Sequence, residues 1–225
     1  MAAMNSTMES RPEMMNFFKN SRLTTLWLML GGVLLMAAPL RAAQAEGPDE
    51  LIRKLSINVI DKIKADKDIQ AGNPKKVSEF VDTVIMPSVN FERMTSLAVG
   101  RGWREATPEQ QRRLITEFRI LLLRTYSGAL GQVTDQTVRL KPLRADPSDE
   151  DVIVRSELVS RRGPPIQLDY RMQKIGTAWK IYDVNVLGVW LVETYRNQFS
   201  QELNNGGVDG LLKSLSEKNK QYAQG

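Results

Sequence analysis

Acidic side chains are the only groups in this sequence that could act as general bases, because its 225 residues contain no histidine and no cysteine. Triads of the serine or cysteine type, imidazole zinc sites and thiol chemistry are therefore excluded. Asp169 and Asp183 both lie in segments with strand periodicity, and a buried Asp on a sheet can serve as a base. Asp169 shares its side of the strand with Gln167 and Arg171, which favours a solvated carboxylate or one paired with a basic neighbour. We expect no catalytic residue, metal site or cofactor.

The segment around Asp169 is the clearest strand in the sequence. In "PIQLDYRMQK" (165–174), apolar residues at alternate positions face one side of the strand and polar residues face the other. The segments "TVRLKPLR", "DVIVRSELVS" and "TAWKIYDVNV" have the same period, and turn-forming residues separate them. Short links between successive strands predict a four-stranded antiparallel meander.

Helices are predicted on both sides of this sheet in the chain. Apolar residues recur at helical spacing in residues 47–66, 73–86 and 91–100. Thr107, Pro108 and Gln110 form a capping box ahead of a long helix that ends near residue 130. Two more helices follow the sheet, separated at Gly206 and Gly207. The prediction is an α+β fold whose helices, from both ends of the chain, pack on one face of the sheet.

The first 45 residues have the pattern of a secretory signal. Lys19 and Arg22 precede an apolar run that ends at Leu40, and Ala43 and Ala45 supply the small residues of a cleavage site. A membrane anchor is the alternative, but the run is interrupted by Pro39 and two glycines and is shorter than the roughly 20 residues that a span needs. We predict cleavage after Ala45, a true start at Met14 or Met15, and a single domain over residues 46–225.

The charge of the chain gives little support to nucleic-acid binding. Its formal net charge is +5, and the basic residues are scattered rather than clustered.

The order of motifs in residues 80–215 resembles the MlaC family of periplasmic phospholipid-binding proteins, also called toluene-tolerance proteins. The resemblance rests on Gly100 and Trp103 ahead of "ATPEQ", on Tyr126 late in the long helix, on "LDY" in the third strand, and on the "WKIYDVNVLG" series. Where many relatives have a small residue after "GV", this chain has Trp190, which would either narrow the mouth of a pocket or reshape a surface.

The resemblance implies a monomeric periplasmic carrier that moves diacyl phospholipids between the two membranes and maintains the lipid asymmetry of the outer membrane. Its implied partners are an inner-membrane ABC transporter complex with a ring-forming substrate-binding protein, and an outer-membrane lipoprotein complex. A hopanoid-associated paralogue with another hydrophobic ligand, an Asp-based enzyme on the same scaffold and a ligand-free adaptor with a filled core stay open as alternatives.

A carrier of this kind needs a deep cavity. Transfer of two acyl chains from an apolar site into water costs on the order of 20 kcal/mol of free energy, at ~0.8 kcal/mol per CH₂ group. We expect the apolar side of the third strand to face the long helix across this cavity. Exposed Arg and Lys side chains near the sheet's open edge, Arg124 and Arg171 among them, are expected to affect delivery more than lipid occupancy. The residues predicted to contact the lipid are Phe80, Val84, Leu97, Phe118, Leu122, Tyr126, Val154, Ile166, Leu168, Tyr170, Met172, Val186, Leu191 and Tyr195.

Overall fold

The sheet is an antiparallel meander of five strands in the order of the chain. The computed structural model describes residues 46–161 and 163–221, and the predicted signal segment, residues 1–45, lies outside them. The strands are β1 (Thr137–Leu140), β2 (Asp151–Val159), β3 (Ile166–Ile175), β4 (Ala178–Val186) and β5 (Val189–Trp190). The predicted α+β class and the meander are confirmed.

The predicted number of four strands is wrong, because β5 follows β4 through a two-residue turn. Val186 pairs with Val189, and both residues between them have positive φ, 53° at Leu187 and 91° at Gly188. Positive φ at both central positions is the geometry of a type I′ hairpin. Val189 and Trp190, which sequence periodicity assigned to the following helix, therefore form a short strand that positions the start of that helix.

The helices before the sheet largely follow the predicted boundaries. The long helix α6 begins and ends where it was predicted: the Gln110 backbone N–H donates to Thr107 Oγ1 (3.2 Å), and the Thr107 N–H donates to Gln110 Oε1 (2.9 Å). The short helices α2 and α5 were not predicted. The helices are α1 (Pro48–Ala65), α2 (Lys67–Gln70), α3 (Pro74–Phe80), the π-helix η1 (Val81–Ile85), the 3₁₀-helix η2 (Met86–Ser88), α4 (Phe91–Val99), α5 (Arg101–Glu105), α6 (Pro108–Leu130) and α7 (Leu191–Gln221).

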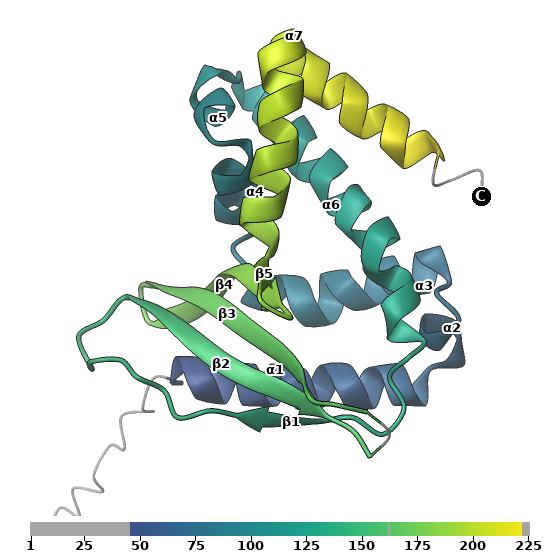
Figure 1. The fold of residues 1–225 in the computed structure, drawn as a ribbon, viewed down its shortest axis with the longest axis vertical. Coiled ribbons are helices and arrows are strands. Elements are labelled where there is room, and N and C mark those ends of the chain that lie inside the picture. The colour runs from purple at the N-terminus through teal and green to yellow at the C-terminus, as the bar shows by residue number, and fades with distance from the viewer. Residues whose placement is uncertain (1–45, 162, 222–225) are drawn as a thin grey trace, which may run out of the picture. The chain divides into compact units, whose positions relative to one another are not determined.

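At β2 and β3, the apolar face of the sheet is covered by α1 and not by the long helix (Figure 1). Ile52 of α1 is fully buried and packs with Val154 and Met172. Burial raises the pKa of the Tyr170 phenol, and hydrogen bonding to Ser56 of α1 partly offsets this effect. The expectation that β3 faces α6 is therefore wrong, because strand periodicity identifies a buried face but not the element that covers it.

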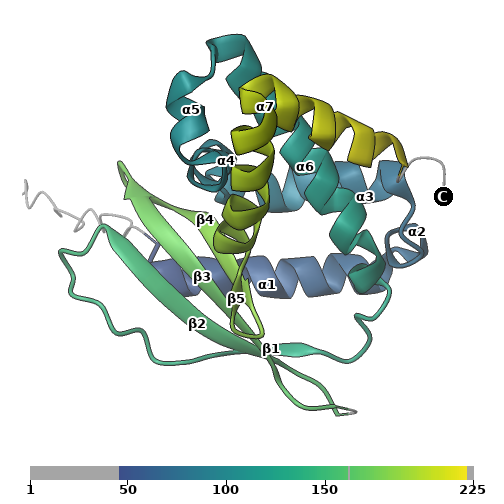
Figure 2. The same ribbon diagram turned by 45° about the horizontal axis from the view of Figure 1, so that its top comes forward.

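A second hydrophobic core lies among α4, α6 and α7, beside the β4–β5 edge of the sheet (Figure 2). Phe118 of α6 is at its centre, with ring centroids 5.7 Å from Phe91, 4.9 Å from Tyr195 and 5.2 Å from Phe199. Gly207 interrupts α7 with φ 62° and ψ −159°, so α7 is two helical segments, as predicted. Within the described residues, no helix has both the length and the apolar character needed to cross a membrane.

Candidate functional site

An apolar cleft lies between the helical layer and the β4 edge of the sheet. Leu122 and Tyr126 of α6 form one wall, and Val184 and Val186 of β4 form another, and Leu191 at the start of α7 also lines the cleft. The cleft has a volume of about 310 Å³. Its remaining lining residues are Val77, Val81, Ile85, Met86, Val89, Phe91, Met94, Arg119, Leu123, Ser127 and Leu130.

The chemistry of the cleft suits a hydrocarbon ligand. Among the described residues that line it, Arg119 is the only charged one, and Ser127 and Tyr126 are the other residues with polar side chains. A volume of about 310 Å³ is near the lower end of the range for small-molecule pockets, roughly 300–1,000 Å³. The site can therefore bury apolar groups, and a ligand with two acyl chains requires its walls to move apart.

The wall formed by residues 77–94 was missed because its helix is irregular. Ile85 and Met86 both line the cleft although they are adjacent in the chain, and a regular helix turns adjacent side chains in different directions. The chain instead passes from α3 through the π-turn η1 and the 3₁₀-turn η2 at Pro87. Asn90 N–H then donates to the Ile181 carbonyl (2.7 Å), which fixes this segment to β4. π-turns often occur at functional sites, and the run "TVIMP" was the available signal.

Four of the predicted pocket residues line this cleft, namely Leu122, Tyr126, Val186 and Leu191. They come from α6, from the end of β4 and from the first residue of α7, so the β5 hairpin brings two of them together. Their contact with a lipid stays a prediction.

The other predicted pocket residues occupy different places. Phe118 and Tyr195 are in the aromatic core, and Leu97 packs against it. Val154, Met172 and Tyr170 belong to the cluster under α1. Phe80 and Val84 join a third cluster that includes residues of α1, α2 and α6. Ile166 is partly exposed at the start of β3, and Leu168, on the same face as Tyr170, pairs with Val186 across the β3–β4 ladder.

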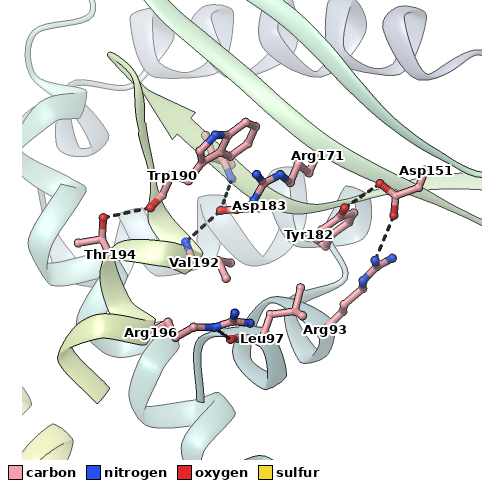
Figure 3. A network of polar contacts seen from close by, with 11 residues as sticks. Arg93, Leu97, Asp151, Arg171, Tyr182, Asp183, Trp190, Val192, Thr194 and Arg196 are labelled. Carbon is pink, nitrogen blue, oxygen red and sulfur yellow. Dashed lines mark hydrogen bonds and ion pairs between the residues drawn. The ribbon is translucent and has the colours of Figure 1, made fainter. Parts of the chain in front are cut away.

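The face of the sheet opposite α1 carries a polar network around Asp183 (Figure 3). Asp183 is fully buried, and its Oδ2 accepts a hydrogen bond from Arg171 Nη1 (3.0 Å). Its Oδ1 accepts from the Val192 N–H (3.0 Å), which caps the start of α7. Burial raises the pKa of the Asp183 carboxyl, and Val192 and Arg171 oppose that shift. Asp183 thus joins the sheet to the helix that borders the cleft.

Trp190 belongs to this network. Its ring lies over the Arg171 guanidinium, 4.0 Å from ring centroid to Cζ, and it is not among the residues that line the cleft. The Trp190 ring is therefore part of the polar network and not of the cleft lining, and its role relative to other family members stays a prediction. Arg171 is paired with Asp183 and stacked on Trp190, while its side chain is 35% exposed; its effect on lipid delivery stays a prediction.

A β-bulge in β4 falls at Tyr182, the residue before Asp183. Arg171 pairs with Asp183 and Met172 with Ile181, so Tyr182 is the extra residue of β4. The Tyr182 hydroxyl donates to Asp151 Oδ1 (2.7 Å), and the Arg93 guanidinium lies over its ring at 3.8 Å. Burial is the largest cause of a raised pKa at Tyr182, and the hydrogen bond to Asp151 is the second; together they raise the pKa to about 12.

We expect this phenol to make the protein less stable in alkali. Tyr182 holds its proton more tightly when folded than when unfolded, so its contribution to stability is complete below pH 10 and is lost as the pH rises through about 12. Urea unfolding between pH 9 and 12 should show this loss, and Tyr182→Phe should reduce it. An equal loss in the variant would contradict the assignment.

Asp169, the other candidate base, is buried rather than solvated. Its Oδ2 accepts from Gln167 Nε2 (2.7 Å), and its Oδ1 has no hydrogen-bond partner among the described residues. The expectation of a solvated or ion-paired carboxylate is therefore wrong, because Arg171 pairs with Asp183. In residues 46–161 and 163–221, no three acidic side chains are grouped in a way that could hold a metal ion.

Comparisons with known proteins agree with this fold. A family model described as "MlaC protein" matches residues 44–217. The toluene tolerance protein ttg2D of Pseudomonas putida is 26% identical over 79% of this chain and 82% of its own length. The intermembrane phospholipid transport system binding protein MlaC of Haemophilus influenzae is 23% identical over 79% of this chain and 85% of its own.

A solved structure from Ralstonia solanacearum, titled as a phospholipid-binding protein in complex with a phospholipid, is 45% identical. Its TM-score is 0.76, and the match covers 79% of this chain and 99% of that one.

Proposed function

This chain belongs to the MlaC family, and from that premise we propose that it binds a diacyl phospholipid in the cleft between α6 and β4 and carries it between membranes. The observation that carries the proposal is the almost wholly apolar lining of the cleft, which a soluble carrier needs. At ~0.8 kcal/mol per buried CH₂ group, only an enclosed apolar site offsets the exposure of two acyl chains to water. A relative of 45% identity, described as a phospholipid complex, supports the same ligand class.

One wall of the cleft is a segment of irregular helix whose backbone is hydrogen-bonded to β4 after its last turn, at Asn90. The π-turn η1 and the 3₁₀-turn η2 have poorer hydrogen-bond geometry than a regular helix, and Pro87 lacks a backbone N–H. We infer that this segment shifts away from α6 when two acyl chains enter, while α6 and the sheet keep their positions.

The setting of this activity is part of the proposal. We propose that cleavage after Ala45 releases the chain to the periplasm, where it acts as a monomer. There it exchanges lipid with an inner-membrane ABC transporter complex that includes a ring-forming binding protein, and with an outer-membrane lipoprotein complex. This role would contribute to outer-membrane lipid asymmetry. No catalytic role is proposed for Asp183, because its two oxygens are engaged by Arg171 and by the start of α7.

Extraction of the purified protein tests the ligand class. Denaturing organic extraction followed by mass spectrometry should release about one diacyl phospholipid per chain, because the lining of the cleft is almost wholly apolar and its walls can move apart to enclose two acyl chains. Protein refolded from denaturant, and thus stripped, should regain lipid from vesicles. A chain that yields no lipid, or that yields a polycyclic ligand such as a hopanoid, would contradict the proposal.

A further inference from the structure

The cleft continues along α6 into a second hollow that carries positive charge. This second hollow, about 290 Å³, lies between α3 and α6. The two hollows share Val77, Arg119, Leu123 and Ser127 as lining residues, so they meet along one face of α6. Arg119 is the charged residue that lines the apolar cleft, and the second hollow is lined by both Arg119 and Arg124.

Arg119 stands at the boundary between the two hollows. Its guanidinium forms an ion pair with the exposed Asp82 and donates to Ser78 Oγ (3.3 Å), and its side chain is 23% exposed. An ion pair with an exposed carboxylate contributes little to stability, so the guanidinium can exchange it for another anion. Arg119 is therefore held at the boundary with N–H donors that an incoming anion can take over.

Arg124 is the second cation of this hollow. It donates through Nη1 to the Asn219 carbonyl, a neutral acceptor, and it forms no ion pair with any described acidic residue. Arg124 lines the same hollow as Arg119, and Ser78 and Ser127 add hydroxyl groups to it. Two guanidinium groups and two hydroxyls match a phosphodiester, which accepts forked N–H donors.

The hairpin beside the cleft has a different character. Val186 and Leu191 line the cleft but not the second hollow, and the hairpin between them exposes Leu187 (65%) and Val189 (55%). Arg171 of β3, the cation of the polar network around Asp183, is already paired with Asp183. An anionic group is consequently favoured in the hollow between α3 and α6 and not beside the hairpin.

We propose that the hollow between α3 and α6 binds the phosphate group of an amphiphile whose acyl chains lie in the adjacent cleft, with Arg119 and Arg124 as its ligands. This inference rests on the proposed lipid binding and adds the position and charge of the headgroup. It also revises the sequence-based expectation for Arg124, since a phosphate ligand affects lipid retention and not delivery alone.

A retention assay with two matched lipids tests the proposal. Delipidated protein is loaded with phosphatidylglycerol or with diacylglycerol of the same acyl chains, and loss of lipid to acceptor vesicles is followed in time. We expect wild type to hold phosphatidylglycerol longer than diacylglycerol. The double variant Arg119→Gln, Arg124→Gln should release phosphatidylglycerol about tenfold faster or more, because loss of one charge-assisted hydrogen bond lowers the affinity by about that factor. It should release diacylglycerol at an unchanged rate.

Arg112→Gln is the matched control. It removes the same charge from the exposed face of α6, outside both hollows, and should release both lipids as wild type does. Equal release of phosphatidylglycerol from the double variant and wild type would overturn the headgroup site while leaving lipid binding intact. Failure of wild type to load either lipid would overturn the proposed function itself.

Inorganic phosphate separates a lipid headgroup from a free anion. Isothermal titration of delipidated wild type with inorganic phosphate should give no saturable binding in the millimolar range, because the acyl chains supply most of the binding free energy. Saturable binding that the double variant lacks, together with unchanged lipid release, would assign the hollow to free phosphate and overturn the headgroup role.

Discussion

Phe118→Ala is expected to lower the free energy of unfolding of the lipid-free protein by about 3–5 kcal/mol. Phe118 is 1% exposed and contacts Phe91, Tyr195 and Phe199, so its removal leaves a cavity that three ring neighbours cannot fill. Urea denaturation of delipidated protein, followed by tryptophan fluorescence, measures the loss. The sequence had assigned Phe118 to the lipid pocket, and the size of this effect decides between pocket and core.

Leu122→Ala, one turn further along α6, is the matched control. Leu122 lines the cleft and is only partly buried, so its loss should cost the delipidated protein about 1 kcal/mol or less. The same change should shorten lipid retention, whereas Phe118→Ala should leave retention unchanged wherever the variant is folded. If Phe118→Ala cost no more stability than Leu122→Ala, Phe118 would belong to the cleft.

Leu122→Trp is expected to reduce the amount of lipid bound at least tenfold while the protein stays folded. In a packed core the larger side chain would force neighbouring side chains off their rotamers and cost about 1–3 kcal/mol. In the cleft the indole instead occupies acyl space between α6 and β4, where Leu122 and Val184 are both lining residues. The melting temperature of the delipidated variant should match that of delipidated wild type, and extraction with mass spectrometry measures the lipid.

Thr116→Trp controls for the added indole. Thr116 lies on the exposed side of α6, six residues before Leu122, and lines neither hollow. It should carry as much lipid as wild type. Should Leu122→Trp unfold, or retain its full complement of lipid, the cleft between α6 and β4 would not be the acyl site.

Local patterns were enough to predict much of the fold. The capping box of Thr107 and Gln110 fixed the start of α6, because the bonds of a capping box join residues three apart in the chain. The alternation of β3 placed Tyr170 and Met172 on the apolar face for a similar reason, since neighbouring side chains on a strand point to opposite sides. The type I′ turn of β5 was equally local, but "LG" is a weaker signal than Asn-Gly.

The candidate site was harder to predict, because its walls depend on interruptions of regular structure. Leu122 and Tyr126 could be found from the wide apolar stripe of α6. The walls from residues 77–94 needed the π-turn, and the network around Asp183 needed the bulge at Tyr182. Each interruption shifts the periodicity on which a sequence-based prediction rests.

By itself, the sequence determined that this protein has no imidazole or thiol chemistry. It also determined that the strands of a sheet with one apolar face follow one set of helices in the chain and precede another. Those properties depend on composition and on neighbours within four residues. Only the tertiary structure decided that α1 covers this face, that Phe118 is core while Leu122 lines the cleft, and that Arg119 and Arg124 meet α3 in one hollow. These outcomes depend on which apolar surfaces of distant segments are in contact, and burial of apolar area has no direction that a local pattern could encode.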